Sequence, residues 1–95
     1  MARRIDNALI GAGTVTAGVA TAEVADADDN RNELTITNDS DTVIYLALGE
    51  AAVLNKGIRL NAAGGSWSTT GERVFQGAVN CICSVASKNL CVVEF

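Results

Sequence analysis

Short segments of β-prone residues recur about every 8–12 positions along this chain, with polar turn residues between them. Segment 33–38, Glu-Leu-Thr-Ile-Thr-Asn, alternates polar and apolar residues, and segment 43–48, Val-Ile-Tyr-Leu-Ala-Leu, is continuously β-prone. Only segment 50–56 has a helical pattern, and it is too short to form a stable helix. The spacing predicts an all-β fold, namely a small antiparallel β-sandwich or jelly-roll-like barrel of about seven or eight short strands.

The other strands are expected in five segments that turn residues separate: 58–61, 66–69, 74–75, 78–85 and 90–95. Residues 14–24 are expected to form a strand pair or one long bent strand, with Gly18 marking a bulge. Residues 1–13 end in Gly-Ala-Gly and predict an extended N-terminal arm. The expected organisation is therefore an arm over 1–13 and a single β-sandwich domain over 14–95.

Composition excludes several classes of function. The chain has 95 residues, of which 48% are hydrophobic, and a net charge of -4. It has no histidine, which excludes His-dependent catalytic triads and Cys/His zinc sites. The acidic balance and an aromatic content of 4% argue against nucleic-acid binding. No stretch approaches the roughly 20 apolar residues of a membrane span. We therefore expect a protein that is not an enzyme and that has no catalytic residue, cofactor, metal or membrane partner.

The start of the chain has some features of a secretory signal. Arg3 and Arg4 precede a mildly apolar stretch, 8–22, that ends in small residues. Asp6 follows the arginines, and glycine and threonine residues interrupt the stretch. Because a signal needs a continuous apolar region, we expect this segment to be retained.

Two loops hold residue types that bind ions in other proteins. Asp26, Asp28 and Asp29 could ligate calcium, but they lack the spacing, the glycine and the terminal glutamate of an EF-hand loop. The Gly-Gly-Ser run at 64–66 lacks the lysine and the spacing of a phosphate-binding loop. We interpret the first as a solvated acidic loop and the second as a turn.

The three cysteines are Cys81, Cys83 and Cys91, an odd number that does not suit a fully paired secreted domain. Cys81 and Cys83 are two positions apart, so they share one face of the predicted strand with Val79 and Val85. Our main interpretation is that they are buried core thiols. The alternative is a disulfide between Cys83 and Cys91 across a hairpin with a three-residue loop.

Segments 43–48 and 90–95 are apolar on both faces. A sandwich of this size cannot cover both faces from its own chain, so the second face must meet the N-terminal arm or another subunit. We therefore expect a homo-oligomer, with a trimer favoured. For Tyr45 and Trp67, packing in the core is the favoured alternative to an interface role. The candidate interface residues are Arg3, Arg4, Leu9, Ile10, Tyr45, Trp67 and Phe95.

Three runs within residues 36–95 resemble a known viral module. Run 36–49 contains the pattern Asn-x-Ser-Asp-Thr-x-Ile-Tyr-Leu-x-x-Gly, and run 57–67 contains Gly-Ile-x-Leu-x-x-x-Gly-Gly-Ser-Trp. Run 77–83, Gly-Ala-Val-Asn-Cys-Ile-Cys, resembles the strand that follows. Together they resemble small virion proteins of tailed bacteriophages and modules within larger phage structural proteins.

This resemblance covers about two thirds of the chain and implies a structural role. The first function that it implies is a capsid decoration, or cement, protein that binds the outer surface of the assembled head. Its partners would be the major capsid protein or other virion structural proteins. It would be located on the capsid surface, and in the host cytoplasm before assembly. The second implied function is a connector or cap module of a tail, head fibre or tail fibre.

Overall fold

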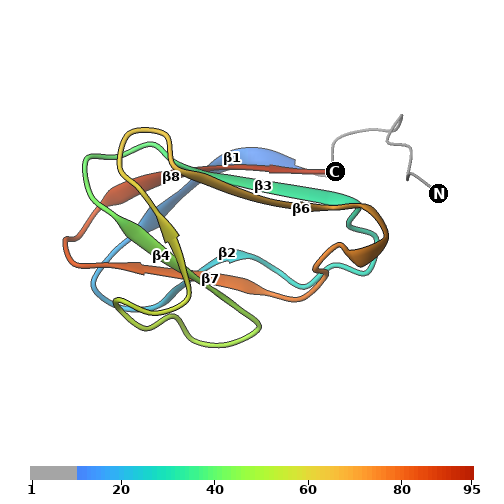
Figure 1. Ribbon diagram of the computed structural model, residues 1–95, viewed down its shortest axis with the longest axis horizontal. Coiled ribbons are helices and arrows are strands. Elements are labelled where there is room, and N and C mark those ends of the chain that lie inside the picture. Colours follow the sequence, from blue (N-terminus) through green and yellow to red (C-terminus); the bar gives the residue numbers. More distant parts are fainter. Residues whose placement is uncertain (1–10) are drawn as a thin grey trace.

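The computed structural model describes residues 11–95, which form two four-stranded antiparallel sheets packed face to face (Figure 1). A turn of 3-10 helix, η1 (Gly71–Arg73), follows the sixth strand. The strands are β1 (Gly11–Ala17), β2 (Ala22–Ala25), β3 (Glu33–Asn38), β4 (Ile44–Leu48), β5 (Ile58–Leu60), β6 (Ser66–Thr70), β7 (Val79–Cys83) and β8 (Lys88–Glu94).

Sheet A has the strand order β1-β8-β3-β6, and sheet B has the order β2-β7-β4-β5. Successive strands cross from one sheet to the other, except β4 and β5, which are neighbours in sheet B. This strand order is that of a jelly roll, which is built from two Greek-key motifs. The predicted all-β sandwich of jelly-roll type is confirmed.

The hydrophobic core lies between the sheets and is made from alternate residues of each strand. In β3, for example, Leu34 and Ile36 are fully buried, whereas Thr35 and Thr37 between them face outward and are half-buried. The fully or almost fully buried apolar residues are Ala17, Leu34, Ile36 and Leu90 of sheet A and Ile44, Leu46, Leu60, Val79, Cys81 and Cys83 of sheet B.

Asn38 is a buried polar residue that joins the two sheets at one end of the core. Its Nδ2 donates to the carbonyl oxygens of Thr42 at 2.8 Å and Leu60 at 3.0 Å. The hydroxyl of Ser40 donates to Asn38 Oδ1 at 2.6 Å, and the same Oγ accepts from the backbone N–H of Thr42. The Asn-x-Ser-Asp-Thr run therefore forms the crossover from β3 to β4, and the buried side-chain amide of Asn38 has hydrogen-bond partners for both its nitrogen and its oxygen.

The segment 14–24 forms parts of two strands in different sheets. β1 and β2 do not pair with each other, so both the strand pair and the single bent strand are wrong. Gly18 lies in the connection between them and marks no bulge, whereas the register irregularity lies in β2, between Glu23 and Ala25. β1 begins at Gly11, so residues 11–13, which the sequence assigned to the arm, belong to sheet A. Residues 1–10 of the predicted arm lie outside the described residues.

Segment 50–56 forms no helix, as its length predicted, and has a turn at residues 54–55. One smaller prediction is corrected. Segment 74–75 is not a strand, because its backbone is used elsewhere: the carbonyl of Phe75 accepts from Arg31, and the carbonyl of the next residue, Gln76, accepts from the N–H of Asp28.

The cysteine predictions have mixed outcomes. Cys81 and Cys83 are buried in the core from β7, as expected. The alternative disulfide is wrong, because β7 and β8 lie in different sheets and form no hairpin, and all three thiols are unpaired. Cys83 faces the core, whereas Cys91 is half-buried on the outward side of sheet A. Val85 lies beyond the end of β7 and is 48% exposed, so it is not on the buried face.

Candidate binding surfaces

The outer face of sheet A is built mainly from small side chains that carry a hydroxyl. Outward residues alternate with core residues along each strand, and the strand register aligns them in rows. One row is Thr14, Cys91, Thr37 and Ser66, and the next includes Val93, Thr35 and Ser68. We call this surface the hydroxyl face, and it consists of Thr14, Thr16, Thr35, Thr37, Ser66, Ser68, Thr70, Asn89, Cys91 and Val93.

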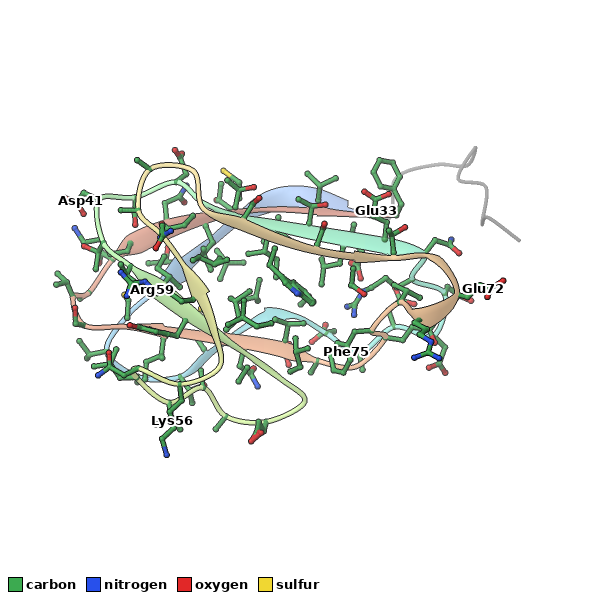
Figure 2. The ribbon with its side chains drawn as sticks, viewed as in Figure 1. Glu33, Asp41, Lys56, Arg59, Glu72 and Phe75 are labelled. Atoms are coloured by element: carbon green, nitrogen blue, oxygen red, sulfur yellow. The ribbon has the colours of Figure 1, made fainter. Side chains whose placement is uncertain are left out.

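Charged residues lie only at the ends of the hydroxyl face. Glu33 is the first residue of β3, and Figure 2 shows it far from Asp41 along the length of sheet A. At the Asp41 end, Lys88 Nζ lies 2.7 Å from Asp41 Oδ1, and this bond lowers the pKa of the Asp41 carboxyl. Burying ions in an interface costs desolvation energy, whereas hydroxyls can exchange water for a partner's polar groups. The uncharged centre of this face therefore suits contact with another macromolecular surface.

The outer face of sheet B is covered in part by the loop 49–57. The Tyr45 hydroxyl donates to Asn55 Oδ1 at 3.1 Å, and Asn80 Nδ2 donates to the carbonyl of Glu50 at 2.6 Å. The outward apolar side of strand β4, which the sequence assigned to the arm or another subunit, is thus covered in part by the chain itself.

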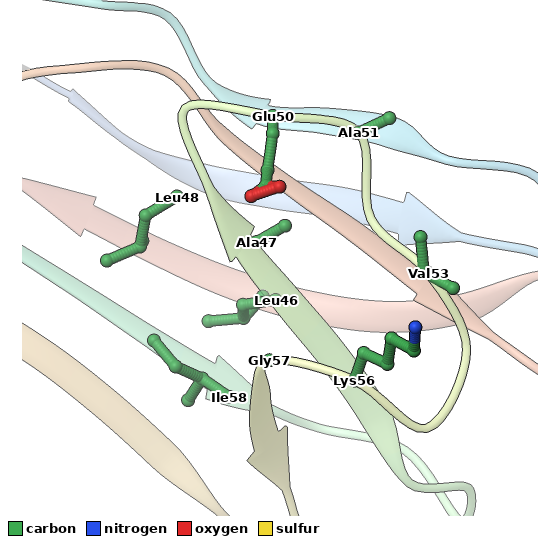
Figure 3. A pocket seen from close by; sticks show the side chains of 9 residues that line it. All are labelled: Leu46, Ala47, Leu48, Glu50, Ala51, Val53, Lys56, Gly57 and Ile58. Carbon is green, nitrogen blue, oxygen red and sulfur yellow. The ribbon is translucent and has the colours of Figure 1, made fainter.

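An open cavity of about 400 Å³ lies between this loop and β4 (Figure 3). Glu50 and Lys56 bring the charged groups, and the lining holds no hydroxyl or thiol nucleophile. A cavity of this size and polarity can hold a small apolar group. Its apolar lining is Leu46, Ala47, Leu48, Ala51, Val53, Gly57 and Ile58.

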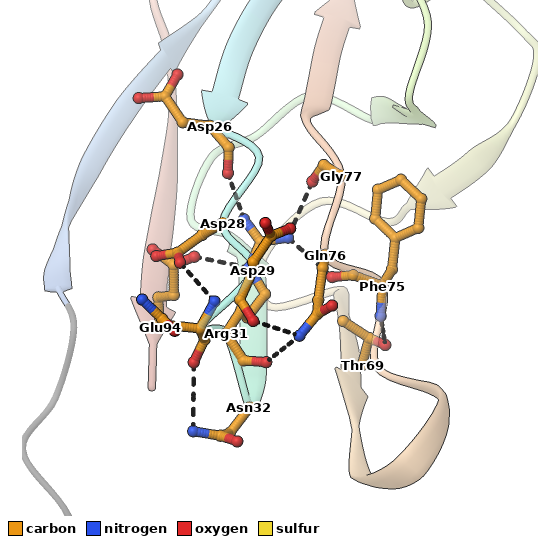
Figure 4. Close-up of polar contacts among 11 residues, drawn as sticks. Asp26, Asp28, Asp29, Arg31, Asn32, Thr69, Phe75, Gln76, Gly77 and Glu94 are labelled. Atoms are coloured by element: carbon orange, nitrogen blue, oxygen red, sulfur yellow. Dashed lines mark hydrogen bonds and ion pairs between the residues drawn. The ribbon is translucent and has the colours of Figure 1, made fainter.

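Arg31 joins the loop before β3, the segment before β7 and the end of β8 (Figure 4). Its side chain is fully buried, and Nε lies 2.6 Å from Glu94 Oε2. Its remaining nitrogen atoms donate to the carbonyls of Phe75 at 2.8 Å, Gly77 at 2.9 Å and Asp26 at 2.6 Å. Because each of its three nitrogen atoms donates to another part of the chain, this arginine is a structural tie.

The acidic loop 26–30 immediately precedes Arg31 in the chain. Asp28 Oδ1 accepts from the backbone N–H of Asn30 at 2.8 Å, which is a local turn contact. A hydrogen bond with Asp26 raises the pKa of the exposed Glu23 carboxyl. Within the described part of the chain, no group of three or more Cys, Asp or Glu side chains could hold a metal ion.

The predicted interface residues do not form one site. Trp67 faces inward and packs against the core, which confirms the favoured prediction of core packing over an interface role. Tyr45 instead lies on the outer face of sheet B, and Phe95 lies half-buried beyond the end of β8 in sheet A. Arg3, Arg4, Leu9 and Ile10 lie outside the described residues.

Sequence reasoning missed the hydroxyl face and Arg31. A signal for the face is present as Thr-x-Thr at 14–16 and 35–37 and Ser-x-Ser-x-Thr at 66–70. Hydroxyl residues at every second position mark the outward side of a strand whose other side is buried. No local pattern identifies Arg31, because its partners come from segments far apart in the sequence.

No model of a known protein family, no curated protein and no solved structure matches this chain. In the part of the chain that the structure describes, no helix is long and apolar enough to cross a membrane.

Proposed function

We propose that this chain is a non-catalytic structural protein of a bacteriophage virion that binds the outer surface of the assembled head as a decoration protein. The observation that carries the proposal is the hydroxyl face, which presents rows of small uncharged side chains across all four strands of sheet A. Such a face fits flat against a large surface without burying ions.

Two further points support this role. The chain resembles small virion modules over residues 36–95, and the jelly roll is a fold that occurs in viral capsid proteins. The charged groups of Arg31 and Glu94 bind each other and stabilise the fold. In this proposal the role of the fold is to hold the binding face in place.

Stabilisation would follow from mass action. A protein that binds only the assembled shell favours that state by its binding free energy. Weak contacts repeated around a symmetric shell add up through multivalency. Partners would be the major capsid protein or other virion structural proteins.

The decisive experiment removes the protein from virions and heats the particles with and without added purified protein. We expect stripped heads to lose DNA at a lower temperature and added wild-type protein to restore retention. Unchanged heads combined with missing tails or lost adsorption would instead support a tail or fibre component.

A matched pair of variants tests the face. Thr37→Lys adds a charge in the middle of the hydroxyl face, and Ala51→Lys adds the same charge to an exposed loop residue over sheet B. We expect Thr37→Lys to abolish head binding and Ala51→Lys to retain it. Equal binding by both folded variants would reject the hydroxyl face as the attachment surface.

The N-terminal arm makes a second contribution in this proposal. Arg3 and Arg4 would contact acidic groups on the neighbouring protein. Deleting residues 1–10 leaves β1 intact, since β1 begins at Gly11. We expect the truncated protein to fold and to bind heads more weakly, with a smaller dependence of binding on salt than the full chain.

A further inference from the structure

The two sheets differ in how their edges are protected. The edge strands of sheet B are short, at four residues for β2 and three for β5. β2 carries the charged Glu23 and a register irregularity, and β5 carries the charged Arg59. Short strands, charges and bulges are the usual means by which proteins prevent edge-to-edge pairing. The edge strands of sheet A, β1 with seven residues and β6 with five, contain no charge and no proline, and their registers are regular.

The cross-strand hydrogen bonds show which backbone groups face these edges. In an antiparallel ladder, pairs that exchange both hydrogen bonds alternate with pairs that exchange none. Glu33 and Phe95 exchange both bonds, at N···O distances of 3.1 and 2.8 Å. The backbone groups of Thr35 and Thr37 therefore also point to β8, and those of Leu34 and Ile36 point to β6.

On β6, the partners of Leu34 and Ile36 are Thr69 and Trp67. The N–H and C=O groups of the alternate residues, Ser66, Ser68 and Thr70, therefore point away from β3 toward the edge of the sheet. Within residues 11–95, no strand pairs with this edge.

The same alternation continues through β8 to β1. Because Val93 and Cys91 use their backbone groups toward β3, Val92 and Leu90 use theirs toward β1, where they pair with Gly13 and Val15. The backbone groups of residues 12, 14 and 16 are then directed to the outer edge of β1. Sheet A thus has a row of donors and acceptors along each edge.

We propose that β1 of one copy of this chain adds to β6 of the next copy, so that sheet A continues from subunit to subunit. Because each neighbouring pair in the order β1-β8-β3-β6 is antiparallel, β1 and β6 run in opposite directions. Two copies placed side by side in the same orientation therefore bring these edges together as an antiparallel pair. The contact joins different surfaces, so it generates a ring or an open chain.

The register of this contact follows from the edge groups. Placing Thr14 opposite Ser68 also places Thr16 opposite Ser66, and each pair then exchanges backbone hydrogen bonds. All these side chains lie on the outer side of sheet A, so the hydroxyl face continues across the subunit boundary. On the inner side, Val15 of one copy comes next to Trp67 of the other.

A second copy is the occupant that these edges fit best. Each chain has a net charge of -4, so two copies repel each other where acidic loops meet, but β1 and β6 bring no charge to the contact. Backbone pairing supplies affinity in strand addition, while alternate side chains set the register. This inference concerns contacts between copies and does not depend on binding to a virion.

Sedimentation of the purified protein tests it with matched proline variants. Ser68→Pro removes an N–H that points to the edge of β6 and leaves the ladder to β3 intact. Arg59→Pro is the control. The N–H of Gly49 donates to the carbonyl of Ala78 at 2.7 Å, so by the same alternation the backbone groups of Tyr45 also point to β7. Arg59 lies opposite Tyr45, and its N–H therefore points to the outer edge of β5. We expect Ser68→Pro to sediment as a 9.8 kDa monomer with the wild-type circular dichroism spectrum, and Arg59→Pro to assemble as the wild type does. Assembly of folded Ser68→Pro at wild-type strength, or a monomeric wild-type protein, would overturn the proposal.

Crosslinking tests the direction of the contact without proline. In a Cys91→Ser background, one sample carries Thr14→Cys and a second carries Ser68→Cys. With a short bismaleimide, we expect covalent dimers only when the two samples are mixed. Dimers formed by either variant alone would mean that like edges pair about a two-fold axis, and no crosslink in the mixture would reject the β1–β6 contact.

Discussion

Arg31 and Glu94 lie 63 positions apart in the sequence, yet Nε of Arg31 donates to Oε2 of Glu94 at 2.6 Å from a fully buried guanidinium. The same guanidinium donates to the carbonyls of Phe75, Gly77 and Asp26. One side chain therefore fixes the loop before β3, the irregular segment before β7 and the end of β8 relative to one another.

Replacing Arg31 should be among the most destabilising changes in this chain. Arg31→Ala leaves a carboxylate and three carbonyls without their donors in a buried site, and removing one partner of a buried pair costs about 3–5 kcal/mol. Arg31→Lys should also be strongly destabilised, because one ammonium cannot reach four acceptors in different directions. Urea unfolding measures both losses.

Glu94→Gln is the comparison for this prediction. It keeps an oxygen that can accept from Arg31 Nε, and the three carbonyl contacts remain. We expect a smaller loss of unfolding free energy than for Arg31→Ala. An Arg31→Ala protein within about 1 kcal/mol of the wild type, the worth of a single net hydrogen bond, would contradict the structural role assigned here.

The sequence predicted the strands well where alternation and turn chemistry coincide. Segment 33–38 alternates cleanly and is β3, and segment 58–61 contains β5, which ends one residue earlier, at Leu60. Asn38 ends β3, and its side chain organises the following crossover through Thr42 and Leu60. These elements depend on neighbouring residues, which a sequence pattern records directly.

The failures arise where distant segments decide the local structure. Val74 and Phe75 have high strand propensity, but the Phe75 carbonyl accepts from Arg31, and the backbone N–H of Phe75 donates to the Thr69 hydroxyl at 2.9 Å. Cys83 and Cys91 are close enough in sequence for a hairpin, but the jelly-roll order sends their strands to different sheets. Propensity contains no information on either tertiary arrangement.

The hydroxyl face was visible in the sequence as an alternating pattern but not as a surface. Thr14, Thr37 and Ser66 become neighbours only through the pairing of β1, β8, β3 and β6. The sequence emphasised aromatic residues instead, and Trp67 packs against the core. Interface prediction from residue type alone fails in such a case because position on the sheet decides exposure.

Thiol reactivity should separate the three cysteines. Burial, with a smaller contribution from Cys83, raises the pKa of the Cys81 thiol to about 11, and only the thiolate reacts. At pH 8 we expect Cys91 to label in native protein, and Cys81 and Cys83 to label only after denaturation. A Cys91→Ser protein should lose the fast reaction, and rapid native labelling of that variant would contradict burial of the other two.

The raised pKa of Cys81 also predicts a pH dependence of stability. In the folded state this thiol keeps its proton to a higher pH than in the unfolded chain, so its contribution is fully present below the unfolded-state pKa of about 9. The contribution is lost as pH rises through the folded-state pKa near 11. Unfolding free energy measured between pH 8 and pH 11 should therefore fall less steeply for Cys81→Ala than for the wild type.

Asp41 should titrate below its ordinary range because of Lys88. The Lys88 ammonium donates to Asp41 Oδ1 at 2.7 Å, and the Thr42 hydroxyl donates to the same oxygen at 3.0 Å, so the pKa of Asp41 is lowered. Any stability from this exposed pair is present above the unfolded pKa of Asp41 and is lost as pH falls through the folded pKa. NMR titration of Lys88→Met should show the pKa of Asp41 rising toward its ordinary value, and an unchanged pKa would contradict the contact.

Gly57 should not accept a side chain, for two independent reasons. Its φ of 86° lies in the left-handed region, and a Cβ built there would lie 2.3 Å from the carbonyl oxygen of Leu46. The strain of the left-handed region alone costs about 1–2 kcal/mol for an L-residue, and the clash with backbone adds to it, so Gly57→Ala should lower the melting temperature by several degrees. Gly18→Ala is the control, because no atom lies within 4 Å of a Cβ at that position. Thermal unfolding followed by circular dichroism gives the melting temperature of each variant. If Gly57→Ala has the same melting temperature as Gly18→Ala and the wild type, the loop 49–57 is not held against β4 as described.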